Sequence, residues 1–119
     1  MAQQQHEQYG RIAIEFTSVA MGNDLCVVIA GGELPHLGAV AVAQARPSLQ
    51  DKTKTSATTS VITLLGHKED VVASRVAHTL AARLNKNVVV CCGIHVDDIR
   101  PDEMEFVDGA VRRYLENFV

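Results

Sequence analysis

The sequence lacks the features by which nucleic-acid-binding and membrane proteins are commonly recognised. It has no tryptophan and only 4% aromatic residues, so we expect no aromatic platform on which bases could stack. The net charge of −3 favours neither nucleic acid nor a membrane surface as a partner, and no apolar run approaches the roughly 20 residues that cross a bilayer. The opening residues, MAQQQHEQYG, are polar and unlike a signal peptide, so we expect a cytoplasmic protein.

Cysteine is also scarce, with only Cys26, Cys91 and Cys92 in the chain. The odd count and the absence of zinc-ligand spacing argue against a disulfide framework and against a structural zinc site. We expect reduced thiols that pack as small apolar side chains, with a redox-active or nucleophilic cysteine as the alternative. Cys91 and Cys92 are neighbours in a strand-like run, so they should point to opposite faces of a sheet.

The chain does contain a series of apolar segments typical of one small domain. We expect residues 1–9 to form a disordered leader and residues 10–119 to form a single domain with its own core. Ile12, Ile14 and Phe16 alternate with polar residues, which predicts a strand with one buried face. The predicted strands cover residues 11–21, 25–30, 38–45, 58–65 and 87–94, with a hairpin turn at residues 22–24 and a polar loop at residues 46–57.

Two helices are predicted in the second half of the chain. Apolar residues recur at i, i+4 spacing over residues 69–84, which indicates an amphipathic helix. Pro101 suits a first helical position. An apolar stripe then follows on Met104, Val107, Val111, Tyr114, Leu115 and Phe118.

The predicted element order is β-β-β-β-α-β-α, which favours an α+β fold with an antiparallel-rich sheet of five to six strands and two helices packed on it. Such a sheet leaves a face or an edge exposed, and a homodimer is a plausible way to bury it.

Three polar motifs follow the predicted strands. In GGELPHLG, residues 31–38, the glycines either shape a turn or let the backbone approach a flat or anionic ligand, with His36 as a hydrogen-bond donor. In GIHVDD, residues 93–98, Asp97 either orients the imidazole of His95 or, like Asp98, caps the last helix. His36, His67, His95 and Asp97 lack the local spacing typical of a metal site.

The third motif, GHKED, lies where a strand gives way to the best-defined helix. His67 and Lys68 would stand beside unpaired backbone N–H groups at the positive end of the helix dipole. With the hydroxyls of Thr58, Thr59 and Ser60, these groups could bind a phosphate monoester. The alternative is a solvated polar corner. No GxxxxGK[ST] pattern is present, so a nucleoside triphosphatase is not indicated, and spacing alone names no reaction.

Together, GGELPHLGAVAVA, TTSVITLLGHKED and VVVCCGIHVDDI resemble the bacterial prenylated-flavin chaperones that accompany UbiD-type decarboxylases of hydroxyarylic acids such as gallate and protocatechuate. The resemblance covers about residues 10–118. It implies a non-catalytic carrier that binds prenylated flavin mononucleotide (FMN), or FMN itself, and helps deliver it to the apo-decarboxylase. The residues that the resemblance assigns to the flavin site, with our inferred phosphate ligands, are His36, Gly38, Thr58, Thr59, Ser60, His67, Lys68, His95 and Asp97.

A weaker resemblance, within residues 59–90, is to the small proteasome-assembly chaperones of eukaryotes, and it implies an antiparallel sheet with helices and a dimer. Two other functions stay open at this point. One is an assembly or interaction module that binds no small molecule. The other is a small enzyme that uses His95 and Asp97 as a base, with or without a metal.

Overall fold

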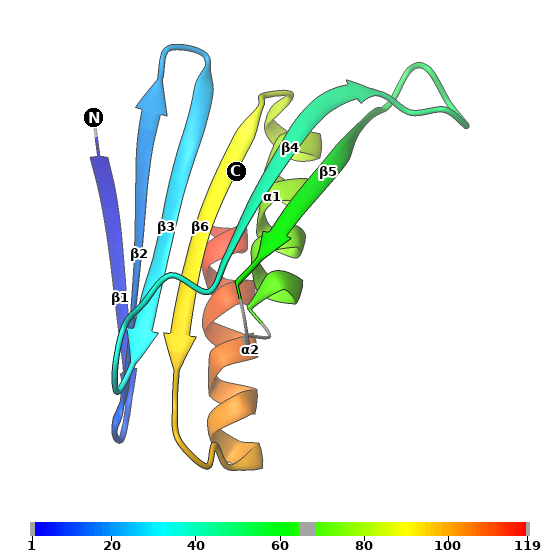
Figure 1. Ribbon diagram of the computed structural model, residues 1–119. Coiled ribbons are helices and arrows are strands. Elements are labelled where there is room, and N and C mark those ends of the chain that lie inside the picture. The colour runs from blue at the N-terminus through cyan, green and yellow to red at the C-terminus, as the bar shows by residue number, and fades with distance from the viewer. Residues whose placement is uncertain (1, 65–68, 119) are drawn as a thin grey trace.

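In a computed structural model, which describes residues 2–64 and 69–118, two helices cover one face of a six-stranded sheet (Figure 1). The elements are β1 (Ala2–Tyr9), β2 (Ile12–Met21), β3 (Asp24–Gly32), β4 (Ala39–Pro47), β5 (Thr55–Thr63), α1 (Asp70–Leu84), β6 (Val88–His95) and α2 (Pro101–Glu116). The strand order is β1-β2-β3-β6-β4-β5. Among the described strands, only β3 and β6 pair in parallel. The predicted α+β class is confirmed, but five strands rather than four precede α1.

The additional strand is the amino-terminal segment, so the prediction of a disordered leader over residues 1–9 is wrong for the described part. β1 pairs with β2 along its whole length, and alternate side chains reach α2. Glu7 forms an ion pair with Arg113 at 2.6 Å, and the ring of Tyr9 stacks on Phe106 with centroids 5.3 Å apart. Sequence periodicity missed this strand because backbone pairing and polar contacts stabilise it, without an apolar face.

The core lies between the helices and the sheet, and the predicted alternation builds it. In β2, Ile12, Ile14 and Phe16 are completely buried, while Glu15 between them is exposed. Phe16 stacks on Tyr114 of α2, with ring centroids 4.5 Å apart. Burying each large apolar side chain stabilises the fold by about 1.5–3 kcal/mol. The prediction of a strand with one buried face is therefore confirmed.

Both helices begin where the sequence predicts. α1 has Glu69 at its N-cap and ends at Asn85, which adopts a left-handed conformation with φ 53°. In α2, Val111, Tyr114 and Leu115 are buried, as predicted. Met104 is exposed, which corrects its place in the predicted stripe. The buried position in that first turn belongs to Glu103, whose side chain is paired with a cation.

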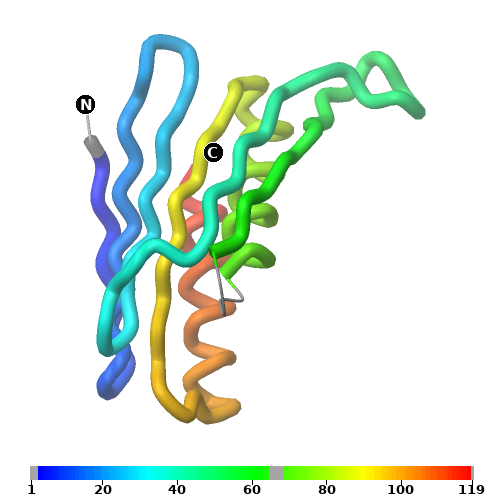
Figure 2. Tube along the Cα trace, in the orientation of Figure 1, coloured from blue at the N-terminus to red at the C-terminus, as the bar shows by residue number. Residues whose placement is uncertain are grey.

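The hairpin of β4 and β5 is longer than predicted, because only residues 48–54 of the expected loop connect the strands. Arg46 Nε donates a hydrogen bond of 2.7 Å to Thr58 Oγ1 across the hairpin. The N–H of Ser48 continues the ladder to the carbonyl of Lys54 at 2.8 Å. The tip of this hairpin extends beyond the rest of the sheet (Figure 2).

The face of the sheet opposite the helices, here called the open face, is uncovered by any described helix (Figure 1). Its central strands present small and apolar side chains, because the alternate residues point into the core. Val28 and Val42 are 41% and 43% exposed on this face, and Ile62 is more exposed still. Cys26 and Cys91 lie half-buried among them.

Residues 33–38, here called the crossing loop, run from β3 over the open face of β6 to reach β4 (Figure 1). The loop is tied to β6 at both ends. The N–H of Glu33 donates to the carbonyl of His95 at 2.8 Å, and the N–H of Gly38 donates to the carbonyl of Cys92 at 2.9 Å. These bonds satisfy backbone groups that would otherwise be unpaired where the chain leaves one strand and joins another.

Between these two anchors the crossing loop lies directly on Gly93. A Cβ atom at this position would overlap the carbonyl oxygen of His36. Glycine is therefore required in β6 by the close approach of a second backbone segment. This contact explains why the motif GIHVDD begins with a glycine.

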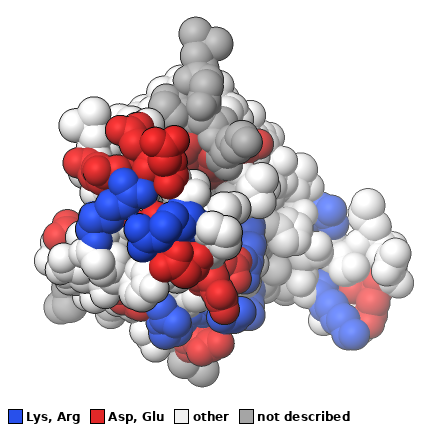
Figure 3. Space-filling model, turned by 90° about the horizontal axis from the view of Figure 1, so that it is seen from below, with Lys and Arg blue, Asp and Glu red and all other residues white. Residues whose placement is uncertain are grey.

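Arg11 ties the start of the crossing loop to the base of α2. Its guanidinium contacts both carboxylate oxygens of Glu103, at 2.9 and 3.0 Å, and that side chain is only 1% exposed. It also donates to Glu33 Oε1 at 3.0 Å and to the carbonyl of Asp97 at 2.7 Å. Seen from below, acidic and basic side chains are interspersed rather than segregated (Figure 3). This end of the molecule is therefore held by paired charges.

We expect Gly93→Ala to destabilise the fold by about 1–3 kcal/mol or more, because the crossing loop has to move off β6. The matched control is Gly109→Ala, at a buried glycine of α2 whose added Cβ would meet mainly the flexible side chain of Arg113. Helix propensity favours that change by up to about 1 kcal/mol. Chemical denaturation measures both, and equal stabilities of the two variants would contradict the proposed contact.

We expect the pairing of Glu103 to make stability depend on pH in acid. The hydrogen bond from Arg11 and the backbone N–H of Arg100 lower the pKa of Glu103 from 4.5 to about 2. Because the folded-state pKa is the lower one, the stabilisation is complete above 4.5 and is lost as the pH falls toward about 2.

Glu103→Gln should therefore be less stable than the parent at pH 7, and should lose less stability between pH 4.5 and 2. Glu105→Gln, at an exposed position of the same helix, is the control. Urea unfolding at a series of pH values measures the difference. Parallel curves for the parent and Glu103→Gln would show that this carboxylate does not contribute.

Candidate functional site

A cavity of about 290 Å³, here called the bay, opens on the sheet beside the crossing loop. Strands β3 and β6 form its floor, and the loop forms one wall. Its side-chain lining comes from Val28, Ala30, Pro35, His36, Leu37 and Cys91. The lining is therefore almost wholly apolar, with one imidazole, which is a composition typical of a site for a small organic ligand.

Two predicted site residues, His36 and His95, meet at this end of the sheet. Their ring centroids are 5.4 Å apart, with the planes tilted by 52°. His95 Nε2 lies 2.9 Å from Asp97 Oδ1. The N-cap of α2 is Arg100, so the prediction that Asp97 caps the helix is wrong. The alternative, in which Asp97 orients the imidazole, is the one that the geometry supports.

The carboxylate of Asp97 determines what His95 can offer a ligand. An ionised carboxylate only accepts hydrogen bonds, so a neutral His95 facing it carries its proton on Nε2 and presents Nδ1 as an acceptor. His95 and Asp97 are both partly exposed, with side-chain exposures of 37% and 76%. The pair is thus open to a ligand or to solvent at the rim of the bay.

The neighbouring cysteines separate to opposite faces, as predicted. Cys92 points into the core, where burial first and the nearby Glu69 second raise the pKa of its thiol to about 12. Cys91 lines the bay, and burial also raises its pKa, with a smaller contribution from Cys26. Thiols with raised pKa values stay protonated near neutral pH and are poor nucleophiles. The expectation of small apolar thiols is confirmed.

The third motif reaches the same end of the sheet through Glu69. A Cβ atom on Gly38 would lie 2.6 Å from Glu69 Oε2, so Gly38 leaves room for this buried carboxylate at the N-cap of α1. The N-terminus of α1 is thereby placed next to the end of the crossing loop. His67 and Lys68, predicted to bind phosphate, lie outside the described residues.

The three hydroxyl-bearing residues that were predicted to belong to the site are spread along β5. Thr58 and Ser60 point to the open face and Thr59 points to α1, where its Oγ1 is 3.2 Å from His78 Nδ1. Leu64, which is bonded to Gly38, is four to six positions further along the chain, or about 13–20 Å at the rise of a strand. None of the three residues is among those that line the bay.

Arg11 is a supporting residue that sequence reasoning missed, and Glu33, a polar residue at the end of a strand, was given no role. Arg11 joins β2 to the start of the crossing loop through Glu33, and the N–H of Asp97 donates to the same Glu33 oxygen at 3.1 Å. The carboxylate of Glu33 therefore connects the motif GGELPHLG to the motif GIHVDD. The only sequence signal was a charged residue at the start of an alternating strand, which by itself is ordinary surface polarity.

The described residues contain no group of three or more His, Cys, Asp and Glu side chains that is placed to hold a metal ion. Among the helices in the described ranges, none is long and apolar enough to cross a bilayer. What this part of the chain offers a ligand on the open face is an apolar floor and two imidazoles.

Comparison with known proteins supports the fold and identifies the family. The fold matches a chain in the crystal structure of a chaperone complex for yeast 20S proteasome assembly, with a TM-score of 0.53, 15% sequence identity and coverage of 98% of this chain and 92% of that chain. At this identity the match shows the fold alone. No curated protein sequence is detectably similar. Residues 8–119, however, match the prenylated flavin chaperone LpdD-like domain. The chain therefore belongs to the family of LpdD-like prenylated flavin chaperone domains.

Proposed function

We propose that the protein binds prenylated FMN without catalysing a reaction and delivers it to a UbiD-type decarboxylase of aromatic acids. The observation that carries this proposal is that two separate motifs meet at the bay. His36 lines it and lies against His95, with ring centroids 5.4 Å apart, while Gly38, at the end of the same crossing loop, lies close to Glu69 at the start of α1. Membership of the family supplies the identity of the ligand.

The bay suits the ring system of such a ligand. Val28, Ala30 and Cys91 form an apolar floor for a prenylated ring, and His36 and His95 can hydrogen-bond with its polar edge. The volume of about 290 Å³ is at the lower end of the ~300–1,000 Å³ typical of ligand pockets. The ribityl phosphate would therefore extend outside the bay, and we propose that backbone N–H groups at the N-terminus of α1 and Lys68 bind it.

We also propose that the protein is a homodimer whose two copies pair through the open face. The face presents Val28, Val42 and Ile62 to solvent, and paired copies would bury these side chains. The interface would lie beside the bay, so flavin binding and pairing could affect each other. Native mass spectrometry measures the oligomeric state of the protein directly.

The first experiment is anaerobic purification after co-expression with a flavin prenyltransferase, followed by absorption spectroscopy and native mass measurement. We expect a flavin chromophore and the added mass of prenylated FMN on each chain. A colourless protein that also takes up no added FMN would instead favour a ligand-free interaction module. Activity that a chelator abolishes would favour a metal enzyme based on His95 and Asp97.

Val28→Asp should reduce flavin retention at least about tenfold, because it places a carboxylate against an apolar ring and a charge without a partner is costly to bury. Val42→Asp is the matched control, since both valines are about equally exposed on the same face but only Val28 lines the bay. Both changes would also disturb the proposed pairing through the open face, so the loss in Val28→Asp beyond that in Val42→Asp reports on the bay. Fluorescence titration with FMN measures both. An equal loss of flavin affinity in the two variants would show that the ligand binds outside the bay.

Lys68→Ala should weaken flavin retention about tenfold, the value of one charge-assisted hydrogen bond to phosphate, while leaving partner binding nearly intact. Lys54→Ala, in the hairpin connection 48–54, is the control for a general loss of positive charge. Unchanged affinity in Lys68→Ala, by the same titration, would show that this lysine is part of a solvated corner and that the phosphate lies elsewhere.

A further inference from the structure

β5 is an edge strand whose outer side has no neighbour in the described sheet. On its inner side, Leu64 donates to Gly38, and Ser48 donates to Lys54 at the other end of the hairpin. Inward bonds alternate along an antiparallel pair, so the even-numbered residues of β5 bond to β4. The odd-numbered residues therefore direct their backbone N–H and C=O groups outward, over a strand of nine residues.

This edge lacks the features that normally prevent strand addition. The sequence of β5, TSATTSVIT, contains no charged residue and no proline. Natural edges are usually blunted by such residues or covered by other segments. The opposite edge differs, because β1 contains Glu7 and is tied to α2 through the ion pair with Arg113. β5 is thus the edge that favours pairing with another strand.

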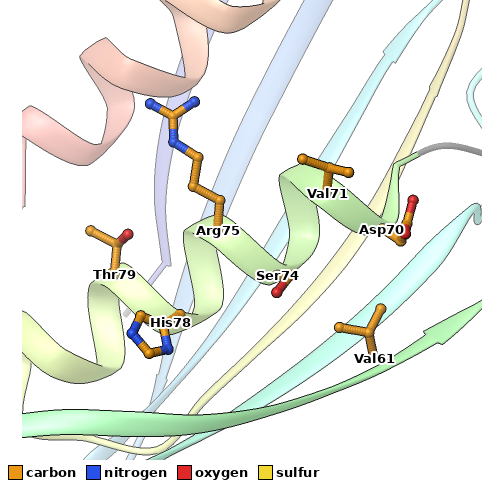
Figure 4. A pocket seen from close by; sticks show the side chains of 7 residues that line it. All are labelled: Val61, Asp70, Val71, Ser74, Arg75, His78 and Thr79. Atoms are coloured by element: carbon orange, nitrogen blue, oxygen red, sulfur yellow. The ribbon is translucent and has the colours of Figure 1, made fainter.

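A groove of about 550 Å³ runs beside this edge, between β5 and α1 (Figure 4). Val61 points from the strand toward the helix, and Ser74 and His78 point from the helix toward the strand. Val61 and Val71 provide exposed apolar surface at one end of the groove. Asp70 lies at the same end. The cation that also lines the groove, Arg75, is paired with Asp108 at 2.8 Å.

We propose that the edge of β5 and this groove dock an extended segment of a partner protein, which adds to the sheet as a strand and inserts alternate side chains into the groove. Strand addition draws its affinity from main-chain hydrogen bonds and its specificity from pockets for alternate side chains. We expect an aliphatic side chain on Val61 and Val71, and a lysine or arginine near Asp70. The proposal rests on the proposed function for the identity of the partner, the receiving decarboxylase.

A second copy of the chain fits the groove less well. The odd-numbered side chains of β5 already face its own helix. Ala57 is buried, and Thr59 is hydrogen-bonded to His78. A paired β5 from another copy would therefore have no unused side chains to place in the groove. An extended segment without a helix behind it would have such side chains.

The test measures the dissociation constant of the full chain for the apo-decarboxylase by biolayer interferometry. Val61→Pro removes one outward N–H and leaves the inward ladder unchanged, as edge strands tolerate. We expect it to weaken binding about tenfold or more, because neighbouring bonds of the added strand are also lost. Gln4→Pro makes the same kind of change on β1, the other edge strand, and should bind like the parent.

A second pair of variants does not alter the backbone. Val71→Lys places a cation in the apolar end of the groove, on a side chain that is 69% exposed, so the fold should persist. It should also weaken binding about tenfold by removing the aliphatic contact and repelling a basic segment. Leu49→Lys, at a still more exposed position (86%) in the β4–β5 connection, should have no effect. Flavin retention should be unchanged in all four variants.

The outcomes separate the two proposals. In one outcome, the parent, Val71→Lys and Val61→Pro all bind the decarboxylase with equal affinity. The proposed docking site is then wrong, but the proposal of delivery to the decarboxylase stands. If the parent binds no decarboxylase, delivery is wrong and the docking proposal falls with it. A chain that is dimeric as the parent and monomeric as Val61→Pro would show that a second copy occupies the edge, which also overturns the proposal.

Discussion

The close contact between the crossing loop and Gly93 is the constraint on which the rest of the arrangement depends. Because the loop passes over β6 on the open face, β4 joins the sheet on the far side of β6 from β3. The two helices then cover the other face, and the loop becomes a wall of the bay. A side chain at position 93 would separate the loop from the strand, and His36 from His95.

The polar network at this end of the molecule stabilises the contact between the crossing loop and β6. Arg11 joins the start of β2, the crossing loop and the base of α2 by pairing with Glu33 and Glu103. The bay is thus built on strands and braced by charge pairs. Rigid support of this kind holds a binding site in one geometry before the ligand arrives, which lowers the entropy that binding must overcome.

The surfaces available for partners are separate from the bay wall. The open face offers apolar side chains without charge at its centre, while the edge of β5 offers unpaired backbone groups and a groove. For the proposed function, the protein has to retain its ligand and also meet the protein that receives it. The division between a face with a cavity and an edge with a groove allows both contacts at the same time.

Much of the fold could be predicted from periodicity, because apolar residues at period two or at i, i+4 spacing have to reach a common core. β2, α1 and the opposite orientations of Cys91 and Cys92 were predicted in this way. β1 was missed because its contacts are polar and depend on α2, which follows it by about a hundred residues. The resemblance to prenylated-flavin chaperones predicted the family. The grouping of Thr58, Thr59 and Ser60 with the other motifs assumed that neighbours in sequence share a site.

By itself, the sequence determined the class of fold, the buried faces and the family, because each depends on local spacing and on motifs that can be read in order. Only the tertiary structure decided that the crossing loop lies on β6, that His36 meets His95, and that Asp97 orients an imidazole rather than capping α2. The first two of these contacts join segments about sixty residues apart. No local propensity specifies such pairs, and the order of strands across the sheet brings them together.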